Sequence, residues 1–278
     1  MRRTALIVAC VVSAGLGATA CVDSSDGGVY DWAQREQWEL PNNLREISGL
    51  ALTPDGRLLA HDDERAIIYQ LDYADGAVVK RFALGDPPVE DDFEGIAATA
   101  THLYLVSSKG RVLEARAGGD GESVPYQSFE LGVADTCEVE GATWVKSRNA
   151  LAFVCKRLIG GPRRRTRILF WSLETRAPLE PLEVNTRPAA KFLDTRRLRP
   201  SGIAWDEIHQ RFVVVAAEER ALVEIDTTGQ IVYVARLPLL AHRQAEAIAL
   251  DADGQLLLGD EGGRGKAKLS IYQPRKKK

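Results

Sequence analysis

Short apolar runs that alternate with polar residues follow one another along the chain, and turn residues separate them. The first set of four runs occupies residues 48–84, with Pro54-Asp55-Gly56 and Asp75-Gly76 among its turns. Runs of this length, bounded by such turns, are typical of β-strands joined as hairpins. The pattern therefore predicts an antiparallel unit of four strands.

The same unit returns four more times, and each copy opens with a motif of a polar residue, a glycine or alanine, an apolar residue and an alanine or threonine. The motif starts at Ser48, Glu94, Glu140, Ser201 and Glu246. Its second positions, 49, 95, 141, 202 and 247, are separated by 46, 46, 61 and 45 residues. A period in the forties is typical of the four-stranded blades of β-propellers. The sequence predicts an all-β, five-bladed propeller, with a six-bladed one as the alternative.

The two ends of the repeat region complement each other. The last unit has only three strand patterns before the chain runs out, whereas residues 34–40 form an additional strand pattern ahead of the first unit. Placing this strand on the edge of the last blade would close the ring and remove two exposed strand edges. We therefore expect one propeller domain over residues 34–273.

The 61-residue step carries extra basic residues. They fall in residues 158–166 and 185–198, neither of which has enough alternating apolar positions for another blade. We interpret both as insertions of the third unit, and they are either solvated loops or a docking patch for an anionic partner. Residues 274–278 are expected to be a frayed basic tail.

The first twenty residues differ from the rest. Arg2 and Arg3 precede an apolar run at residues 5–12 and then small residues, a pattern typical of a signal peptide and too short for a membrane-spanning helix. Residues 18–21 fit the bacterial lipobox, which predicts lipidation of Cys21 and a tether over residues 21–33. The expected location is the bacterial cell envelope, as a membrane-anchored lipoprotein facing the periplasm. A soluble periplasmic or secreted protein is the alternative.

The net charge limits the classes of partner, and the cysteine content bears on the expected disulfide. Removal of Arg2 and Arg3 with the leader lowers the 36 basic residues to 34, against 39 acidic ones, which speaks against nucleic acid as a partner. Cys137 and Cys155 then remain, at one end of the same hairpin. In an oxidising compartment they are expected to form a disulfide, and two independent buried thiols are the alternative.

Two columns of the repeat should meet at one mouth of the central channel, because the start of a hairpin's first strand and the end of its second lie at the same edge. The columns pair Ser48 with Glu64, Glu94 with Lys109, Glu140 with Lys156, Ser201 with Glu219 and Glu246 with Glu261. Asp63 and Asp260 adjoin them. Only the last pair, Glu246 with Glu261, brings two carboxylates together.

Facing carboxylates repel each other, so one must take up a proton or both must share a cation. A dense set of carboxylate oxygens suits Ca²⁺ better than a softer metal. The alternative is that these glutamates only accept hydrogen bonds from inner-strand amides and join neighbouring blades by ion pairs. His61 and His242 lie next to the expected mouth, as ligands, as general bases or as structural residues.

Several short segments resemble the SdiA-regulated family of bacterial envelope propellers, which is similar in turn to esterase-like phytase propeller domains. The segments are Leu44–Leu50, Asp63-Glu64, Ile68–Asp72, Asp92–Ala97, Glu246–Ala249 and Asp260-Glu261. The resemblance covers about residues 30–273 and implies an exported propeller with Ca²⁺ in or near the channel. By position, it implies Glu94, Glu140, Glu246 and Glu261 as the residues that hold the cation. The chain departs from a fully acidic pattern at Ser48, Ser201, Lys109 and Lys156.

Two functions are compatible with these features. The first is a non-catalytic, lipid-anchored binding or scaffold protein whose acidic mouth takes an envelope protein or a small ligand. The second is a metal-dependent hydrolase, acting on a phosphoester, ester or lactone, that uses the same carboxylates. The fold itself does not discriminate between them, because propellers support both.

Overall fold

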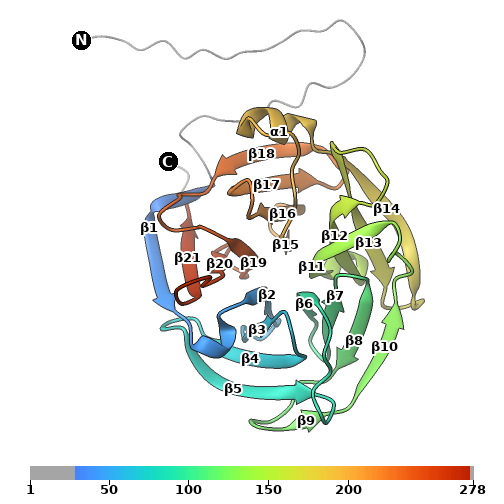
Figure 1. Ribbon diagram of the computed structural model, residues 1–278, viewed down its shortest axis with the longest axis vertical. Helices are drawn as coiled ribbons and strands as arrows, with labels where there is room; N and C mark the ends of the chain where they lie inside the picture. Colours follow the sequence, from blue (N-terminus) through green and yellow to red (C-terminus); the bar gives the residue numbers. More distant parts are fainter. Residues whose placement is uncertain (1–28, 276–278) are drawn as a thin grey trace, which may run out of the picture.

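Five antiparallel sheets surround a central axis in the computed structural model, which describes residues 29–275 (Figure 1). The first four blades each contain, from the axis outward, four strands in chain order, and blade one carries a fifth, short strand on its outer edge. The strands are β2 (Ile47–Leu52), β3 (Leu58–Asp62), β4 (Ile67–Asp72) and β5 (Ala77–Leu84) in blade one; β6 (Phe93–Ala98), β7 (Leu103–Ser107), β8 (Arg111–Ala115) and β10 (Tyr126–Glu130) in blade two; β11 (Cys137–Val145), β12 (Ala150–Leu158), β13 (Arg165–Ser172) and β14 (Ala177–Asn185) in blade three; and β15 (Gly202–Asp206), β16 (Arg211–Ala216), β17 (Ala221–Asp226) and β18 (Ile231–Arg236) in blade four.

Blade five is built from both ends of the chain. Its sheet order is β1 (Tyr30–Glu39), β21 (Lys268–Pro274), β20 (Leu256–Asp260) and β19 (Ala245–Leu250). Tyr30 lies opposite Pro274, and Glu39 lies opposite Lys268. The five-bladed propeller and its closing strand are confirmed, and β1 begins at Tyr30, earlier than the predicted residue 34. The six-bladed alternative is wrong.

Blade two differs from the predicted pattern in its outermost strand. Residues 123–131 give one continuous strand pattern in the sequence, but the structure contains two strands there: β9 (Ser123–Val124) and β10. β9 pairs in parallel with β5 of blade one, through Ala83 with Ser123 and Leu84 with Val124. The segment therefore links two neighbouring blades, because its first residues are hydrogen-bonded to one blade and its last residues to the other.

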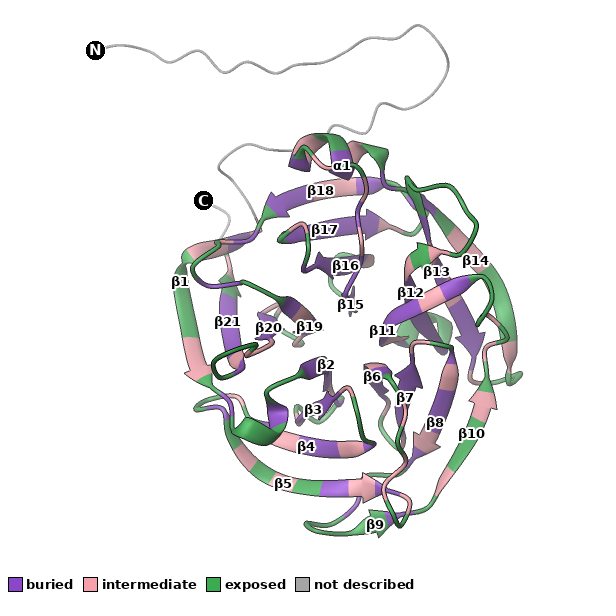
Figure 2. Ribbon diagram, in the orientation of Figure 1, coloured by how far each residue is buried: buried purple, intermediate pink, exposed green. Residues whose placement is uncertain are grey.

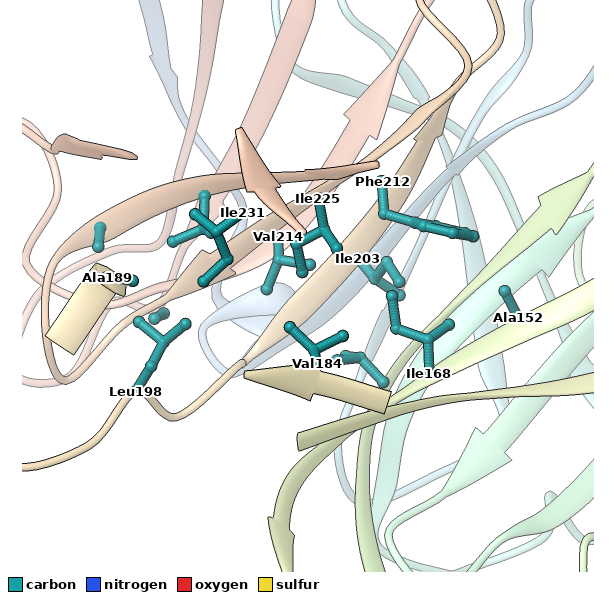
Figure 3. Packing of buried hydrophobic residues seen from close by; sticks show 14 of the residues in the cluster. Ala152, Ile168, Val184, Ala189, Leu198, Ile203, Phe212, Val214, Ile225 and Ile231 are labelled. Carbon is teal, nitrogen blue, oxygen red and sulfur yellow. The ribbon is translucent and has the colours of Figure 1, made fainter. Parts of the chain in front are cut away.

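The core lies between the blades rather than in one central mass. Inner strands are almost wholly buried, whereas outer strands alternate buried and exposed residues (Figure 2). Between blades three and four, Ile168 and Val184 pack towards Ile203 and Phe212 (Figure 3). Because each sheet buries one face against each neighbour, all five sheets depend on one another for burial of apolar surface.

The basic insertions adopt more structure than expected. Residues 158–166 form the end of β12 and a turn, whereas residues 185–198 contain the short helix α1 (Arg187–Leu193). Ala189 and Leu193 of α1 are buried in the cluster between blades three and four. The second insertion is therefore not a solvated loop throughout, because part of it forms a helix that packs into the core. Two short 3-10 turns, η1 (Asn42–Leu44) and η2 (Lys146–Arg148), complete the described elements.

The predicted disulfide is confirmed. Cys137 and Cys155 are both buried and are bonded across β11 and β12, with 5.5 Å between their Cα atoms. Within residues 29–275, no helix is long and apolar enough to cross a membrane. The predicted leader, Cys21 and most of the tether lie outside the described residues, as does the end of the basic tail.

The disulfide should contribute measurably to stability. Cys137→Ala/Cys155→Ala is expected to lower the free energy of unfolding by about 3 kcal/mol, because the bond closes a short loop in the unfolded chain. Urea unfolding of the oxidised protein and of the double variant measures the difference. Wild-type protein treated with a reductant is the control, and equal stability of all three samples would contradict the prediction.

Candidate functional site

Three of the repeated glycines, Gly95, Gly141 and Gly202, lie where the inner strands of neighbouring blades come into backbone contact. A Cβ atom on Gly95 would lie 2.5 Å from the backbone nitrogen of Ala142 and 2.6 Å from the Cα atom of Gly141. A Cβ atom on Gly202 would lie 2.7 Å from the backbone oxygen of Glu246. The glycine is therefore required by the close approach of the strands around the axis. This contact explains why the motif recurs.

In four of the five copies, the residue before the glycine or alanine of the motif lies in a β-bulge. The pairing register shifts between Ile47 and Gly49, between Phe93 and Gly95, between Val139 and Ala142 and between Ala245 and Ala247. A bulge adds a residue to one strand and changes the direction of its side chain. Ser48, Glu94, Glu140 and Glu246 are the residues added. The bulges therefore let carboxylates from separate blades approach one another at one end of the inner strands.

Glu94 has the most strongly perturbed carboxyl group of this cluster. Burial raises its pKa to about 9, and the neighbouring carboxylates of Glu140 and Asp92 act in the same direction. Burial also raises the pKa of Glu140 to about 7, although Lys156 opposes the increase. At neutral pH the Glu94 carboxyl group is therefore protonated and can donate as well as accept a hydrogen bond.

Lys156 lies among these carboxylates. Its Nζ atom is 2.9 Å from Oε1 of Glu140, whose side chain is almost fully buried. Burial acts to lower the pKa of Lys156, but three carboxylates outweigh burial and raise that pKa. They belong to Glu140, Glu246 and Glu94. The predicted pairing of Glu140 with Lys156 is confirmed.

Glu246 and Glu261 form the second acidic pair, as the sequence predicted. Burial raises the pKa of Glu261 to about 7, and Glu246, Asp63 and Glu46 add to the effect. Burial likewise raises the pKa of Glu246, whereas Lys156 opposes it. The side-chain amide of Gln244 donates a hydrogen bond to Glu261. Glu46 and Gln244 were not predicted as site residues, because neither occupies a repeated position.

The remaining predicted mouth residues have other surroundings. Lys109 is exposed, and no ion pair joins it to Glu94 within the described part of the chain, so that expected pairing is not formed. Glu64 is also exposed. Burial raises the pKa of Asp63 to about 6 and that of Glu219 to about 7. Glu219 also accepts a hydrogen bond from the backbone N–H of Arg199.

The two serines of the repeat are buried and bond to backbone. Ser48 donates its hydroxyl to the carbonyl of Glu46. Ser201 donates to the carbonyl of Ala245, 2.9 Å away, and accepts from the N–H of Ala217. Ser201 thereby connects blade four to blade five beside Glu246. The serines replace a carboxylate by a neutral group that needs no counter-ion.

Asp260 and both histidines near the mouth have structural partners. His242 is fully buried and its ring nitrogens lie 2.6 Å from Asp260 and 2.6 Å from the hydroxyl of Tyr272. The Nδ1–H of His61 donates to the carbonyl of Asp62, and its Nε2 atom is buried with no partner. Burial lowers the pKa of His61 to about 4, so the ring is neutral. His61 fills the space that a Cβ atom of Gly49 would occupy.

The described residues do not form a ready metal site. None of their groups of three or more His, Cys, Asp and Glu side chains is placed to hold a metal ion. Lys156 occupies the position next to Glu140 where a cation would bind. The arrangement present therefore does not fit Ca²⁺, which prefers six to eight oxygen ligands. Only a rearrangement that moved the Lys156 ammonium would release these oxygens.

The channel has a different character at its other end. A cavity of about 100 Å³ is lined by the second halves of the inner strands, mainly by Ala, Leu and Ile side chains with Trp144 and Trp205. A larger open groove of about 610 Å³ lies between the end of β1 and the start of β5, and neither cavity is lined by the acidic cluster. The ionisable groups of the channel are thus concentrated at one end.

The comparisons with known proteins agree with this fold. The family model described as SdiA-regulated matches residues 184–276, so the predicted resemblance is confirmed over α1, blade four and the strands β19 to β21 of blade five. A search of curated proteins gave no match. The structure is similar to Myxococcus xanthus glutaminyl cyclase, with a TM-score of 0.57, 13% identity, and coverage of 87% of this chain and 96% of that one. It is also similar to a luciferin-regenerating enzyme, with a TM-score of 0.53, 10% identity, and coverage of 86% and 95%. At these identities the likeness shows the fold alone.

Proposed function

We propose that this SdiA-regulated propeller is an exported, lipid-anchored binding protein of the bacterial envelope, whose acidic mouth takes a positively charged group of a ligand or partner protein. The observation that carries the proposal is the 2.9 Å ion pair of Lys156 with Glu140, at a place where Glu94 and Glu246 of two other blades also act electrostatically on the ammonium group. Glu261 lies beside them. Such a cluster attracts cationic groups and repels anionic ones.

The protonation of these carboxyl groups gives binding a specific signature. Glu94, Glu140 and Glu261 have pKa values of about 9, 7 and 7, so part of the cluster is protonated at neutral pH. An approaching cation favours the ionised carboxylate. Binding should therefore release protons, and affinity should increase with pH between about 6 and 9.

The path of the chain supports an anchored protein with an accessible mouth. The mouth is at the end of blade five where Glu39 and Lys268 pair, whereas the described part of the chain begins at the opposite end, where Tyr30 pairs with Pro274. The N–H of Arg275 also donates to the carbonyl of Val29 there. A lipid on Cys21 would hold this end near a membrane and leave the mouth on the opposite side.

Ca²⁺ remains a prediction that metal analysis can test. Because Lys156 contacts Glu140, the ion would have to displace the ammonium, and no step of the proposed function depends on Ca²⁺. The site as arranged accommodates an organic ammonium group more readily, since such a group needs fewer oxygen ligands. Amines and amine-bearing partners are therefore the preferred ligand class.

Melting experiments with two cationic probes test the proposal. Spermidine and CaCl₂ should each be added to the metal-free protein, and at least one should raise the melting temperature at pH 8 more than at pH 6. Glu246→Gln should reduce this shift by half or more, because it removes a carboxylate from the cluster. Glu180→Gln, in an exposed outer-strand position, is the matched control and should respond like wild type. A protein indifferent to both probes contradicts a cation-binding mouth.

A metal-dependent hydrolase is the second candidate, and one observation favours it. Glu140 and Glu261 have pKa values of about 7, which suits groups that exchange protons at neutral pH. Assays with generic phosphate, ester and lactone substrates, with and without EDTA, test this function. Turnover that is lost in a folded Glu246→Gln variant would establish the hydrolase. Absence of turnover on every substrate class would favour the binding function.

A further inference from the structure

The Lys156 ammonium has an unusual position for a lysine side chain. It donates to Oε1 of Glu140 at 2.9 Å and is also attracted by Glu246 and Glu94. Glu94 belongs to β6, Glu140 to β11 and Glu246 to β19, so the ammonium interacts with three blades. Its side chain is only partly exposed, with a relative accessibility of 29%. A single cation thus compensates carboxylates that would otherwise repel one another.

The backbone that carries Lys156 is held on two sides. The preceding residue, Cys155, is bonded to Cys137 at the start of β11. The carbonyl of Cys155 also accepts a hydrogen bond from the buried hydroxyl of Thr166. Both contacts fix β12 opposite the bulge that contains Glu140. The position of the ammonium therefore follows from the sheet and does not depend on a flexible loop.

Lys109 provides an internal comparison. It occupies the same repeat position in blade two, yet it is exposed, and within residues 29–275 no ion pair involves it. Glu94 of its own blade interacts with Lys156 of blade three instead. The two lysines thus differ in surroundings although they are equivalent in sequence. Only Lys156 is part of the carboxylate cluster.

We propose that Lys156 is the resident cation of the mouth, that it occupies the place of a bound metal ion, and that any external cation must displace it. This inference rests on the proposed cation-binding function in one respect, because it concerns the same carboxylates. It makes Lys156 the residue that determines specificity. The ammonium group of an organic ligand can take the place of the Lys156 ammonium group, whereas Ca²⁺ needs several carboxylate oxygens at once.

Two variants separate the role of Lys156 from a general loss of charge. Lys156→Met removes the ammonium and keeps much of the side-chain stem, and Lys109→Met removes the same charge from the equivalent exposed position. In metal-free buffer at pH 7, Lys156→Met should melt at least several degrees below wild type, whereas Lys109→Met should melt like wild type. Titration with CaCl₂ should show at least tenfold tighter binding to Lys156→Met than to wild type, with no gain for Lys109→Met.

Further variants keep the test decisive if Lys156→Met does not fold. Lys156→Arg retains a cation and should fold without a gain in Ca²⁺ affinity. Lys156→Met/Glu140→Gln removes both partners and should recover stability relative to Lys156→Met. If the double variant were no more stable than Lys156→Met, Lys156 would not be the resident cation of the mouth. Equal melting temperatures of Lys156→Met and Lys109→Met would contradict the proposal in the same way.

The outcomes also distinguish this inference from the proposed function. Wild-type protein that binds Ca²⁺ as tightly as Lys156→Met would overturn the resident cation and leave a cation-binding mouth. Wild-type protein indifferent to CaCl₂ and spermidine, together with a stability loss specific to Lys156→Met and reversed by Glu140→Gln, would overturn the binding function and support the resident cation. A gain of Ca²⁺ affinity in Lys156→Met supports the resident cation, and a response of wild type to either probe supports the binding function.

Discussion

Gly95→Ala should lower the free energy of unfolding by about 3 kcal/mol, although it adds a single methyl group. The added Cβ would lie 2.5 Å from the backbone nitrogen of Ala142 and 2.6 Å from the Cα of Gly141, so the inner strands of blades two and three would have to separate. Backbone atoms cannot move aside as a flexible side chain can. Urea unfolding monitored by tryptophan fluorescence measures the loss.

Gly119→Ala is the matched control for this substitution. A Cβ atom there would meet only Oε2 of Glu122, at 3.4 Å, which is an ordinary contact. The control should therefore change stability by well under about 1 kcal/mol. If Gly95→Ala and Gly119→Ala unfolded at the same urea concentration, the inner strands would not be in backbone contact and the ring geometry described here would be wrong.

Stability should fall as pH rises from about 5 to 9. The pKa of Glu94 is about 9 in the folded protein against an ordinary value of 4.5, so between these values the folded state holds a proton that the unfolded state has released. This contribution to stability is complete below pH 4.5 and is lost as pH rises through 9. Glu94→Gln, which cannot ionise, should stabilise the protein at pH 8 by on the order of 2 kcal/mol and should flatten the pH profile.

Glu64→Gln is the control for the pH experiment, because it makes the same substitution at an exposed glutamate. Its profile should parallel that of wild type. Urea unfolding at several pH values between 5 and 9 supplies the data. A Glu94→Gln profile as steep as that of wild type would show that other groups cause the pH dependence, and the buried, protonated Glu94 would be excluded.

The fold was predictable because it is repeated. Five copies of one motif define the inner strands, and a shortened last unit together with an additional first strand predicts the closed ring. The repeat also places Glu246 near Glu261 and Glu140 near Lys156, since both are pairs within one hairpin. Relations within a blade can be read from spacing, because hairpin geometry fixes which strand ends lie together.

Relations between blades could not be predicted in the same way. The attraction of Glu94 to Lys156, rather than to Lys109, depends on how far blades two and three rotate towards each other and on the bulges before Gly95 and Gly141. Neither has a sequence signal in a single chain. The pairing of β9 with blade one was missed for the same reason, because residues 123–131 give one continuous strand pattern.

The last motif shows a compensation that spacing alone conceals. Ala247 replaces the glycine of the other four copies, and Gly259 lies opposite it on β20. A Cβ atom on Gly259 would lie 2.9 Å from the Cβ of Ala247. In this blade the glycine is therefore on the partner strand β20, where it leaves room for the Cβ atom of Ala247.

Closure by the first and last strands determines when the molecule can be completed. Gln37 donates a hydrogen bond to Ser270, its neighbour across 233 positions of sequence. No ribosome can supply both partners until nearly all of the chain has been synthesised, and contacts this distant in sequence form slowly. Four blades can therefore form before β1 pairs with β21.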